Sequence, residues 1–380
     1  MTNTITYVTP QMLAQGLMAL RQQSILPRRV NRSYEQLAQR KGNVINIPVP
    51  SAIAARTVTG SVIHNSNVAS APTTVAITLD QWYEAPFEMT DNDILSTTTD
   101  FIPMQASEAV KSLANQIDKH IWGKHTGIFS GVGTAGTTPF ASGVTNAADA
   151  RALLNAQLAP PDDWTGILNA DAEGALLNTS NVLQFDQRGD AGGIINGSIG
   201  RKLGVDWFMD QNAVTYTAGT GWLTGWAVKG TGTIGAATLT VVGTQTVMGS
   251  VKVGDIFTLG NFQYAITTVK STASVTDGTI FLFTPPLKEV ILSDAALTVG
   301  YAATQYVPNM LFQRRAFAFA SRPLADVEGF GVALSTPVDP ISGVSLRLEL
   351  SRQYKLTTYS FDALWGSKLV RPEFATKIFG

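Results

Sequence analysis

Histidines are the first residues whose type and spacing suggest chemistry, because two of them placed together can hold a metal ion. The chain has three, His64, His120 and His125. His120 and His125 are five residues apart, which places them about 140° apart around a helix, and Gly123 between them interrupts a helix. A shared metal ion is therefore not predicted. The chain has no cysteine, which excludes disulfides, thiolate metal ligands and cysteine nucleophiles.

Carboxylates are the next candidates, because paired acids can serve as a general acid and a general base. Close pairs occur at Asp91 and Asp93, at Asp162 and Asp163, and at Asp186 and Asp190. None of them has a neighbouring histidine or another acid–base partner in the sequence, so capping or solvated roles are predicted. The chain also lacks a GxxxxGKS/T phosphate loop and a GxSxG nucleophile elbow. We therefore predict that the chain is not an enzyme, with no catalytic residues, no cofactor and no metal.

Charge and length restrict the class of protein further. Charged residues make up 14% of the 380 residues, against roughly 25% in a typical soluble protein. A surface so poor in charge predicts extensive contact with partner subunits. The 27 basic and 28 acidic residues nearly cancel, whereas a dedicated nucleic-acid-binding protein usually has a basic excess. The length predicts two or three packed units.

The N-terminal sequence and the hydropathy pattern indicate where the chain is expected to reside. The opening sequence MTNTITYVTPQ has no basic stretch followed by an apolar run, so no signal peptide is expected. No stretch approaches the ~18 apolar residues of a membrane span. We therefore expect a chain that is made and kept in a cytoplasm and has no membrane contact.

Residues 1–42 are predicted to form an extended arm that carries one helix. Thr9 and Pro10 suit the start of this helix, and Pro27 is predicted to end it. Its apolar stripe consists of Leu13, Leu17 and Leu20. Six basic residues oppose Glu35 alone, namely Arg21, Arg28, Arg29, Arg32, Arg40 and Lys41. These side chains either pair with acidic neighbours and solvent, or contact nucleic acid or an acidic assembly partner.

Residues 43–84 are predicted to form a long hairpin. A first strand begins at Val44 and meets an interruption at Pro48 to Pro50. The chain is then predicted to run out over 53–63, turn at 64–67 and return over 73–82. Val75, Ile77 and Leu79 alternate with small or polar residues, which predicts a strand with one buried face. A hairpin alone is marginally stable, so another surface must cover it.

The clearest helix is predicted over residues 103–122. Asp100 suits its N-cap, and Gly123 suits the position just past its end. Its apolar stripe comprises Ala106, Val110, Leu113, Ile117 and Ile121. Such a helix would be about 30 Å long, enough to span a domain.

The rest of the chain is predicted to be an α+β fold interrupted by an all-β insertion. A mobile loop is predicted over 130–143 and another loop over 188–200. Helices are predicted over 147–158 and 171–178, and strands over 165–169, 205–209, 346–350 and 356–361. Between 216 and 303, short strands recur at 222–228, 238–242, 255–259, 262–269, 279–283 and 296–301, with turns at Gly260-Asn261 and Asp277-Gly278. This segment predicts a small antiparallel barrel.

The order of these elements and several motifs resemble a known family. The motifs are Thr9-Pro10, Val30-Asn31-Arg32 and Lys41 to Ile45; Leu79-Asp80-Gln81-Trp82 and Pro86-Phe87; Phe312 to Leu324 and Phe361 to Glu373; and, in the insertion, Gly254 to Thr258, Tyr264-Ala265 and Pro285-Pro286-Leu287. The chain resembles the major capsid proteins of tailed bacteriophages with the HK-ninety-seven-type fold. Among them it is most similar to the P-twenty-two-type coat proteins, which carry an inserted barrel.

The resemblance implies an α+β capsid fold with named regions. These are an N-terminal arm (1–42), an E-loop hairpin (43–84), a P-domain (85–142) with its spine helix (103–122), an A-domain (143–215), an inserted antiparallel β-barrel domain (216–303), the A-domain continued (304–344), a P-domain hairpin (345–362) and a C-terminal A-domain segment (363–380). The arm and the hairpin are implied to reach onto neighbouring subunits. Candidate contact residues between subunits are Leu13, Leu17, Leu20, Arg28, Arg29, Arg32, Ile53, Arg56, Ile63, His64, Val75 and Ile77.

The resemblance also implies a function and partners. Many copies would assemble as pentamers and hexamers into an icosahedral shell around double-stranded DNA, in the cytoplasm of a host bacterium, and remain in the virion. A separate scaffolding protein, a portal protein at one vertex, a possible decoration protein and non-specific contact with the packaged DNA are implied. Deleting residues 1–32 is expected to leave a folded subunit that does not assemble.

Two other functions fit parts of the sequence. The first is an encapsulin-like shell that stores cargo enzymes in a bacterium. The second is a carbohydrate-active enzyme or binding protein with the barrel as its binding module, in which Trp222 and Trp226 would stack on sugar. Because these two residues share one face of an alternating strand, a core position is favoured for them.

Overall fold

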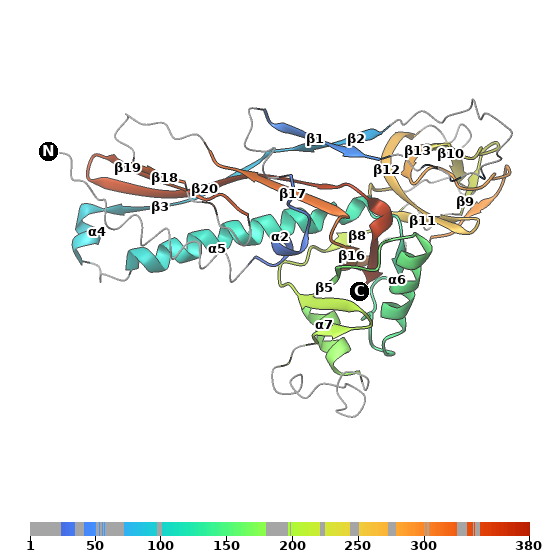
Figure 1. The fold of residues 1–380 in the computed structure, drawn as a ribbon, viewed down its shortest axis with the longest axis horizontal. Helices are drawn as coiled ribbons and strands as arrows, with labels where there is room; N and C mark the ends of the chain where they lie inside the picture. Colours follow the sequence, from blue (N-terminus) through green and yellow to red (C-terminus); the bar gives the residue numbers. More distant parts are fainter. Residues whose placement is uncertain are drawn as a thin grey trace. The chain divides into compact units, whose positions relative to one another are not determined.

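The computed structural model describes residues 24–34, 42–50, 72–96, 101–179, 199–220, 225–243, 251–272, 279–299, 304–324, 333–336 and 343–380, with positions 53, 55, 57, 197, 301 and 338. Contacts within the chain divide it into two units. Unit 1 comprises residues 1–21, 32–113 and 318–370, and unit 2 comprises residues 22–31, 114–317 and 371–380. Helix α5, Phe101–Trp122, and strand β17, Phe317–Arg322, each contain a boundary between the units (Figure 1).

The helix predicted over 103–122 is confirmed as α5, which begins two residues earlier, at Phe101. The five residues of the predicted apolar stripe are all buried, namely Ala106, Val110, Leu113, Ile117 and Ile121. Their 3.6-residue spacing brings them to one face of the helix, which the rest of the chain covers. A short 3₁₀ helix, η1, Gly123–Gly127, follows directly. The predicted cap, Asp100, lies outside the described residues.

Unit 1 contains an antiparallel sheet built around the long strand β20, Leu356–Leu369. Its described strands follow the order β17, β20, β19 (Arg347–Gln353) and β18 (Ala333–Ser335), and β3 (Gln81–Thr90) pairs with β20. The hairpin predicted over 346–350 and 356–361 is confirmed by β19 and β20. Strand β20 nevertheless continues to Leu369, across the boundary predicted between residues 362 and 363. Helix α4, Asp91–Ser96, follows β3.

The base of the predicted hairpin is present as β1, Val44–Val49, paired antiparallel with β2, Thr73–Thr78. Pro48 lies within β1, which pairs with β2 alone among the described strands, so its missing N–H faces an edge. The single strand predicted over 73–82 is wrong. Strand β2 ends at Thr78 and β3 begins at Gln81, because β2 pairs with β1 whereas β3 pairs with β20. The outer hairpin lies outside the described residues except for positions 53, 55 and 57.

The alternation predicted for the returning strand is confirmed. Ile77 and Leu79 are buried, whereas Thr78 and Asp80 are exposed. The buried residues of β1, β2 and the following turn pack in one cluster with residues of β17 and β20, namely Ile45, Ile47, Ile77, Leu79, Ala318, Ala320 and Leu364. The base of the hairpin therefore covers its apolar face against its own chain.

Unit 2 contains a mixed sheet with the strand order β4, β21, β16, β5, β7 and β6. These strands are β4 Gly131–Val132, β5 Trp164–Leu168, β6 Arg201–Lys202, β7 Val205–Met209, β16 Pro308–Gln313 and β21 Ala375–Phe379. Every residue of β5, β16 and β21 is buried, which indicates a sheet covered on both faces. The strands predicted over 165–169 and 205–209 are confirmed as β5 and β7.

The helices predicted in unit 2 are confirmed as α6, Thr145–Ala156, and α7, Ala170–Leu177. The loop predicted over 130–143 is confirmed over most of its length, because turns and bends follow the two-residue strand β4. It contains β4, which pairs in parallel with β21, and it buries Ser130 and Phe140. The Ser130 hydroxyl lies 3.0 Å from the Ala375 carbonyl oxygen and 2.6 Å from the Thr376 hydroxyl. A composition rich in glycine and threonine predicted a loop, but contacts with a distant strand fix it.

The predicted barrel is present in unit 2 as an antiparallel sheet in the order β11, β12, β13, β10, β9 and β14 (Figure 1). Its strands are β9 Trp226–Val228, β10 Thr238–Gly243, β11 Ile256–Leu259, β12 Phe262–Thr272, β13 Thr279–Thr284 and β14 Ala296–Leu297. The two edges approach each other where Thr258 and Thr298 exchange backbone hydrogen bonds of 2.7 and 2.9 Å. The sheet is therefore nearly closed.

The interior of the barrel forms one continuous hydrophobic core. Its buried residues include the four aromatic side chains Phe257, Tyr264, Phe281 and Phe283, and Trp226 also belongs to it. The core position predicted for Trp226 is confirmed, whereas Trp222 lies outside the described residues. The predicted turn at Gly260-Asn261 is confirmed, with Leu259 opposite Phe262 and a positive φ of 62° at Gly260. Two short strands, β8 Tyr216–Thr217 and β15 Gln305–Tyr306, pair where the chain enters and leaves the barrel.

Candidate functional site

The end of the predicted arm is anchored in unit 2 by a buried carboxylate. Segment 24–30 contains the four-residue helix α2, Leu26–Arg29, in which Pro27 lies in the first turn rather than at the end of a helix. A proline suits that position because it has no N–H to donate. The Asp118 carboxylate of α5 accepts the N–H groups of Ile25 and Leu26, both at 3.2 Å. These bonds fix the arm on its own chain.

Burial makes Asp118 an unusual carboxyl group. Its side chain is fully buried, and this raises its pKa well above the ordinary value. The charge of Asp210 raises the pKa further, while the N–H groups of Ile25 and Leu26 and the charge of Arg28 oppose the shift. The hydrogen bonds from the arm thus favour the charged form of Asp118, whereas its burial favours the neutral form.

The structure places three of the arginines that the sequence proposed as contact residues. Arg28 is exposed, and its Nε donates to the Ser24 carbonyl oxygen at 2.9 Å. Arg29 is half-buried, with its guanidinium 3.9 Å from the centre of the Phe208 ring. Arg32 is also half-buried. Leu13, Leu17, Leu20, Arg56, Ile63 and His64, the other proposed contacts of the arm and the outer hairpin, lie outside the described residues.

The remaining proposed contacts belong to the hairpin and differ in exposure. Ile53 has 69% of its surface exposed, Val75 is half-buried and Ile77 is fully buried. Ile77 lies in the chain's own hydrophobic cluster, so its side chain is not available to a neighbouring subunit. The sequence predicted that a face of this strand is buried, but it did not show which chain covers it. The exposed apolar residue at the base of the hairpin is Val44, at 54%.

A buried polar cluster joins the barrel to the mixed sheet within unit 2; its members are Lys377, Asp255, Tyr216, Tyr301 and Tyr306. Lys377 on β21 is completely buried, and its Nζ donates to the Gly254 carbonyl oxygen at 2.9 Å. Asp255 accepts the Tyr216 hydroxyl at 2.8 Å and the Lys252 N–H at 2.9 Å. These hydrogen bonds tie the start of β11 to β21 and β8.

The protonation of this joint cluster is shaped by burial. Burial lowers the pKa of Lys377 to about 7, and the charge of Asp255 partly opposes this shift. Burial also raises the pKa of Tyr216, which the Asp255 charge and hydrogen bond raise further. The pKa of His125 is lowered well below its usual value, first by burial and then by the charge of Lys377. Four of its members are buried and Tyr216 is half-buried, which suits a structural joint between the barrel and the mixed sheet.

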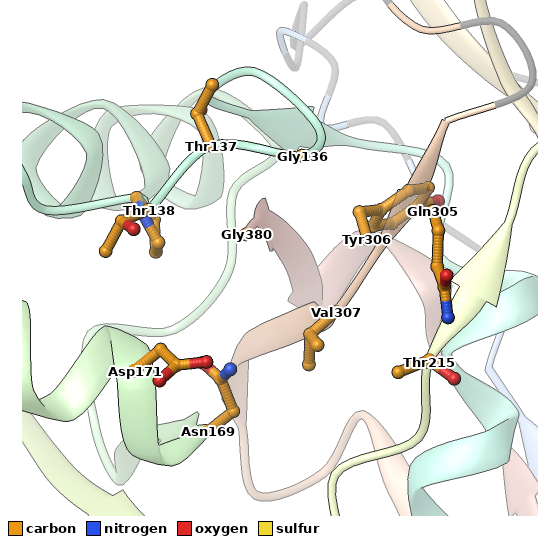
Figure 2. A pocket seen from close by; sticks show the side chains of 11 residues that line it. Gly136, Thr137, Thr138, Asn169, Asp171, Thr215, Gln305, Tyr306, Val307 and Gly380 are labelled. Atoms are coloured by element: carbon orange, nitrogen blue, oxygen red, sulfur yellow. The ribbon is translucent and has the colours of Figure 1, made fainter.

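A pocket of about 320 Å³ in unit 2 shares Tyr306 with this cluster (Figure 2). It is lined by the loop 136–139, the start of α7, Thr215, the segment from Gln305 to Val307, and Gly380. Figure 2 shows Asp171 and Asn169 on the α7 side and Gln305 and Tyr306 on the strand side. The Asn169 side chain caps α7 by accepting the Ala172 N–H at 3.1 Å. The titratable side chains of its lining are Asp171 and Tyr306, and the lining contains no histidine or lysine.

The described residues offer little other chemistry. Within them, no group of three His, Asp or Glu side chains is close enough to hold a metal ion. None of the described helices combines the length and hydropathy of a membrane-spanning segment. His125 is buried against Tyr216, with ring centroids 5.3 Å apart in an edge-on arrangement. The acid pair Asp91 and Asp93 belongs to helix α4, where Asp93 bonds to Thr90 and Asp91 pairs with Arg352 at 2.6 Å.

Sequence reasoning missed the joint cluster and the buried Asp118. Lys377 and Gly254 are 123 residues apart, and Ile25 and Asp118 are 93 apart. No local sequence signal marks Lys377 in its strand or Asp118 in its helix as buried. Asp118 follows the stripe residue Ile117 directly, which was the one available hint that it lies near the covered face of α5.

Comparison with known proteins identifies the fold. No family model and no curated protein matches the chain. A solved structure from Mycobacterium phage Che8 matches with a TM-score of 0.53 and 16% identity, over 94% of this chain and 91% of that chain. The fold is one found in a bacteriophage protein. The capsid of Ralstonia phage GP4 matches with a TM-score of 0.48 and 8% identity, over 94% of this chain and 90% of that chain.

A third match is the mature capsid of bacteriophage PhiM1. It has a TM-score of 0.47 and 10% identity, over 90% of this chain and 82% of that chain.

Proposed function

We propose that this chain is the major capsid protein of a tailed bacteriophage, a structural subunit that builds the head shell and catalyses nothing. The observation that carries the proposal is the match to the Mycobacterium phage Che8 structure over nearly the whole chain. The order of the described elements supports it, because the base of a hairpin, a long helix, an α+β unit and an inserted barrel sheet follow one another.

The finer parts of the proposal concern architecture and partners. Residues 1–42 act as the arm, 43–84 as the E-loop and α5 as the P-domain spine of an HK-ninety-seven-type subunit, with the barrel as a P-twenty-two-type insertion. Pentamers and hexamers of the chain form an icosahedral shell in the host cytoplasm, guided by a scaffolding protein and completed by a portal. The mature virion then holds double-stranded DNA within this shell, with decoration proteins as a possible addition.

The physical argument for assembly is the exposed apolar surface of unit 1. Large apolar side chains there remain open to solvent in the single chain, namely Val44, Ile53, Trp82, Leu95 and Met104. Trp82 has 64% of its surface exposed and Leu95 has 88%. Burial of such side chains against another subunit contributes roughly 1.5–3 kcal/mol each, and each subunit in a shell repeats the contact with several neighbours.

Negative-stain electron microscopy of the purified full-length protein tests this function. The expected result is closed shells or capsomer-like rings, together with elution as a very large particle from a sizing column. A protein that stays a compact monomer at high concentration and turns over a small substrate would refute the proposal.

A truncation tests the role of the arm. Deletion of residues 1–32 would remove α2 and leave Asp118 without the N–H groups of Ile25 and Leu26. Deletion of residues 1–23 keeps these hydrogen bonds and is the cleaner variant. We expect the shorter truncation to fold, as judged by an unchanged melting temperature, and to fail to form normal shells. Normal closed shells from it would contradict the proposed role of the arm.

A further inference from the structure

Two pairs of arginines from distant parts of the chain meet in unit 2. Arg28 and Arg29 form the last half of α2, and Arg314 and Arg315 form the turn between β16 and β17. Two hydrogen bonds connect the segments: the Arg314 Nε donates to the Val30 carbonyl oxygen at 3.4 Å, and the Asn31 N–H donates to the Phe317 carbonyl oxygen at 3.0 Å. The fold therefore concentrates four guanidinium groups, which we call the arginine surface.

The guanidinium groups of this surface act on one another. The pKa of Arg29 is lowered first by burial and then by the positive charges of Arg28 and Arg314, while Asp206 opposes the shift. Arg29 also stacks on the Phe208 ring, which holds its guanidinium in a fixed plane. Like charges brought this close repel each other, and Asp206 offsets part of this repulsion within the chain.

The guanidinium N–H donors of the arginine surface are held in position and accessible to an outside acceptor. The Nε atoms of Arg28 and Arg314 are held by the carbonyl oxygens of Ser24 and Val30, which leaves the terminal N–H groups of each fork for an outside acceptor. Arg28, Arg314 and Arg315 are exposed. In the described part of the chain, none of Arg28, Arg29 and Arg314 forms an ion pair with a carboxylate, and Arg315 approaches Asp162 only to 4.0 Å.

The local charge remains positive when the nearby acids are included. Arg201 lies in the same region, 3.9 Å from Asp206, and Asp162 and Asp163 precede β5. With Asp118, whose carboxyl group interacts with the charge of Arg28, five arginines therefore face four aspartates, a balance of +1 on a chain whose net charge is −1. A partner with closely and regularly spaced negative charge would fit such a surface.

We propose that Arg28, Arg29, Arg314 and Arg315 bind the phosphodiester backbone of double-stranded DNA. This inference rests on the proposed function, because a head shell encloses a polymer that carries about one negative charge per 1.7 Å of its axis. Guanidinium forks suit phosphate oxygens, which they can contact in a bidentate geometry. The acidic surface of a second copy is a poorer fit, because the acids of this sequence occur as separated pairs rather than as a run.

The test measures binding of a duplex of about 30 base pairs by fluorescence anisotropy, between about 50 and 200 mM salt. The full-length protein is kept unassembled at low concentration. For Arg28→Gln with Arg314→Gln we expect the slope of log affinity against log salt to fall by about 2, one unit for each lost phosphate contact. Affinity near 100 mM salt is expected to fall roughly tenfold or more. Arg315→Gln, whose side chain makes only the long ion pair with Asp162, is expected to lower the slope by about 1.

A matched control removes the same charge elsewhere. Lys111→Gln with Arg352→Gln changes two basic side chains that pair with Glu108 and Asp91 outside the arginine surface. We expect this control to leave the salt slope unchanged. An equal fall in the control and in the arginine variants would overturn the proposal, because the effect would then depend on net charge alone.

Micrographs of the same variants separate this inference from the proposed function. Shells that assemble from Arg28→Gln with Arg314→Gln while DNA binding falls support both. Shells with undiminished DNA binding overturn the arginine surface and leave the capsid function intact. Wild-type protein that forms no shell but shows the expected salt slopes refutes the capsid function and keeps the site. Loss of shells in Arg28→Gln with Arg314→Gln but not in the control assigns the arginines to contact between copies and overturns the DNA proposal. If this double variant melts at a lower temperature than the wild type, Arg315→Gln repeats the test.

Discussion

The barrel of unit 2 and the hairpin base of unit 1 are both antiparallel sheets, yet they bury their apolar faces in different ways. The barrel nearly closes on itself, so that side chains from β9 to β14 meet in one interior. The two strands β1 and β2 have no interior of their own, and they rest on Ala318, Ala320 and Leu364. Closure gives a sheet its own core, whereas a two-stranded sheet needs a surface from elsewhere.

This difference explains how each segment can serve a shell. The barrel has its own core, and its residues Ile256 and Ala265 also pack with Phe129 and Phe379 of the host domain. The base of the hairpin, β1 and β2, depends on residues of β17 and β20 to cover its apolar face. In the proposed capsid the second property favours assembly, because apolar surface that one chain leaves open is covered by the next.

The largest effect is expected in the barrel core. Phe281 is fully buried and contacts the rings of Trp226 and Phe257. Phe281→Ala is expected to destabilise the barrel by about 3–5 kcal/mol, through lost burial and the cavity left behind. Calorimetry should show an early transition, and hydrogen exchange should show the loss of protection confined to the barrel.

A neighbouring residue provides the control for this variant. Ile280 lies on the same strand with 38% of its surface exposed, and Ile280→Ala is expected to have a much smaller effect. If Phe281→Ala also removed protection from the β1–β2 base, the barrel would not be an independent core.

The hairpin base should respond less strongly. Ile77→Ala removes a fully buried side chain from a smaller cluster, and we expect a loss of about 2–4 kcal/mol. The lost protection should appear at β1, β2 and β17, with the barrel unchanged. A destabilisation below about 0.5 kcal/mol would show that the single chain does not cover this face.

The joint between the barrel and the mixed sheet should make stability depend on pH. The pKa of Lys377 is about 7 in the folded chain against an ordinary value of 10.5, so the folded chain holds fewer protons than the unfolded chain between these values. Stability should therefore rise with pH across this window, by at most about 1.4 kcal/mol per pH unit, and the gain is lost as pH falls toward 7. Lys377→Met should remove this part of the slope in urea unfolding measured from pH 7 to 10.

The exposed Lys252 supplies a matched control, because its Nζ donates to the Thr217 carbonyl oxygen at the same joint. We expect Lys252→Met to keep the pH dependence of the wild type. An unchanged slope in Lys377→Met would show that the buried amine does not titrate in this range.

The smallest effect on stability is expected at the exposed face of the hairpin base. Val44 has 54% of its surface exposed, and Val44→Ala should change stability by less than about 0.5 kcal/mol. Under the proposed function, Val44→Asp should fold normally and assemble at a higher protein concentration than the wild type. Light scattering during assembly measures this shift, and identical assembly curves would show that Val44 faces no neighbour.

The sequence by itself determined the elements whose pattern is local. The stripe from Ala106 to Ile121 predicted α5, because a 3.6-residue repeat reports one covered face of a helix. The Gly260-Asn261 pair predicted a hairpin turn, because glycine accepts the positive φ that the turn needs. The recurrence of short apolar runs predicted the barrel. These signals are carried by neighbouring residues and do not depend on which distant segment packs against them.

Only the tertiary structure decided what covers each apolar face and which charges meet. The alternation at Ile77 predicted burial, but its cover comes from Ala318 and Leu364, more than two hundred residues later. The split between β2 and β3, the burial of Lys377 and the meeting of Arg28 with Arg314 likewise depend on pairing between distant segments. A sequence pattern fixes the backbone period and the direction of a side chain, whereas its partner is selected by the packing of the whole chain.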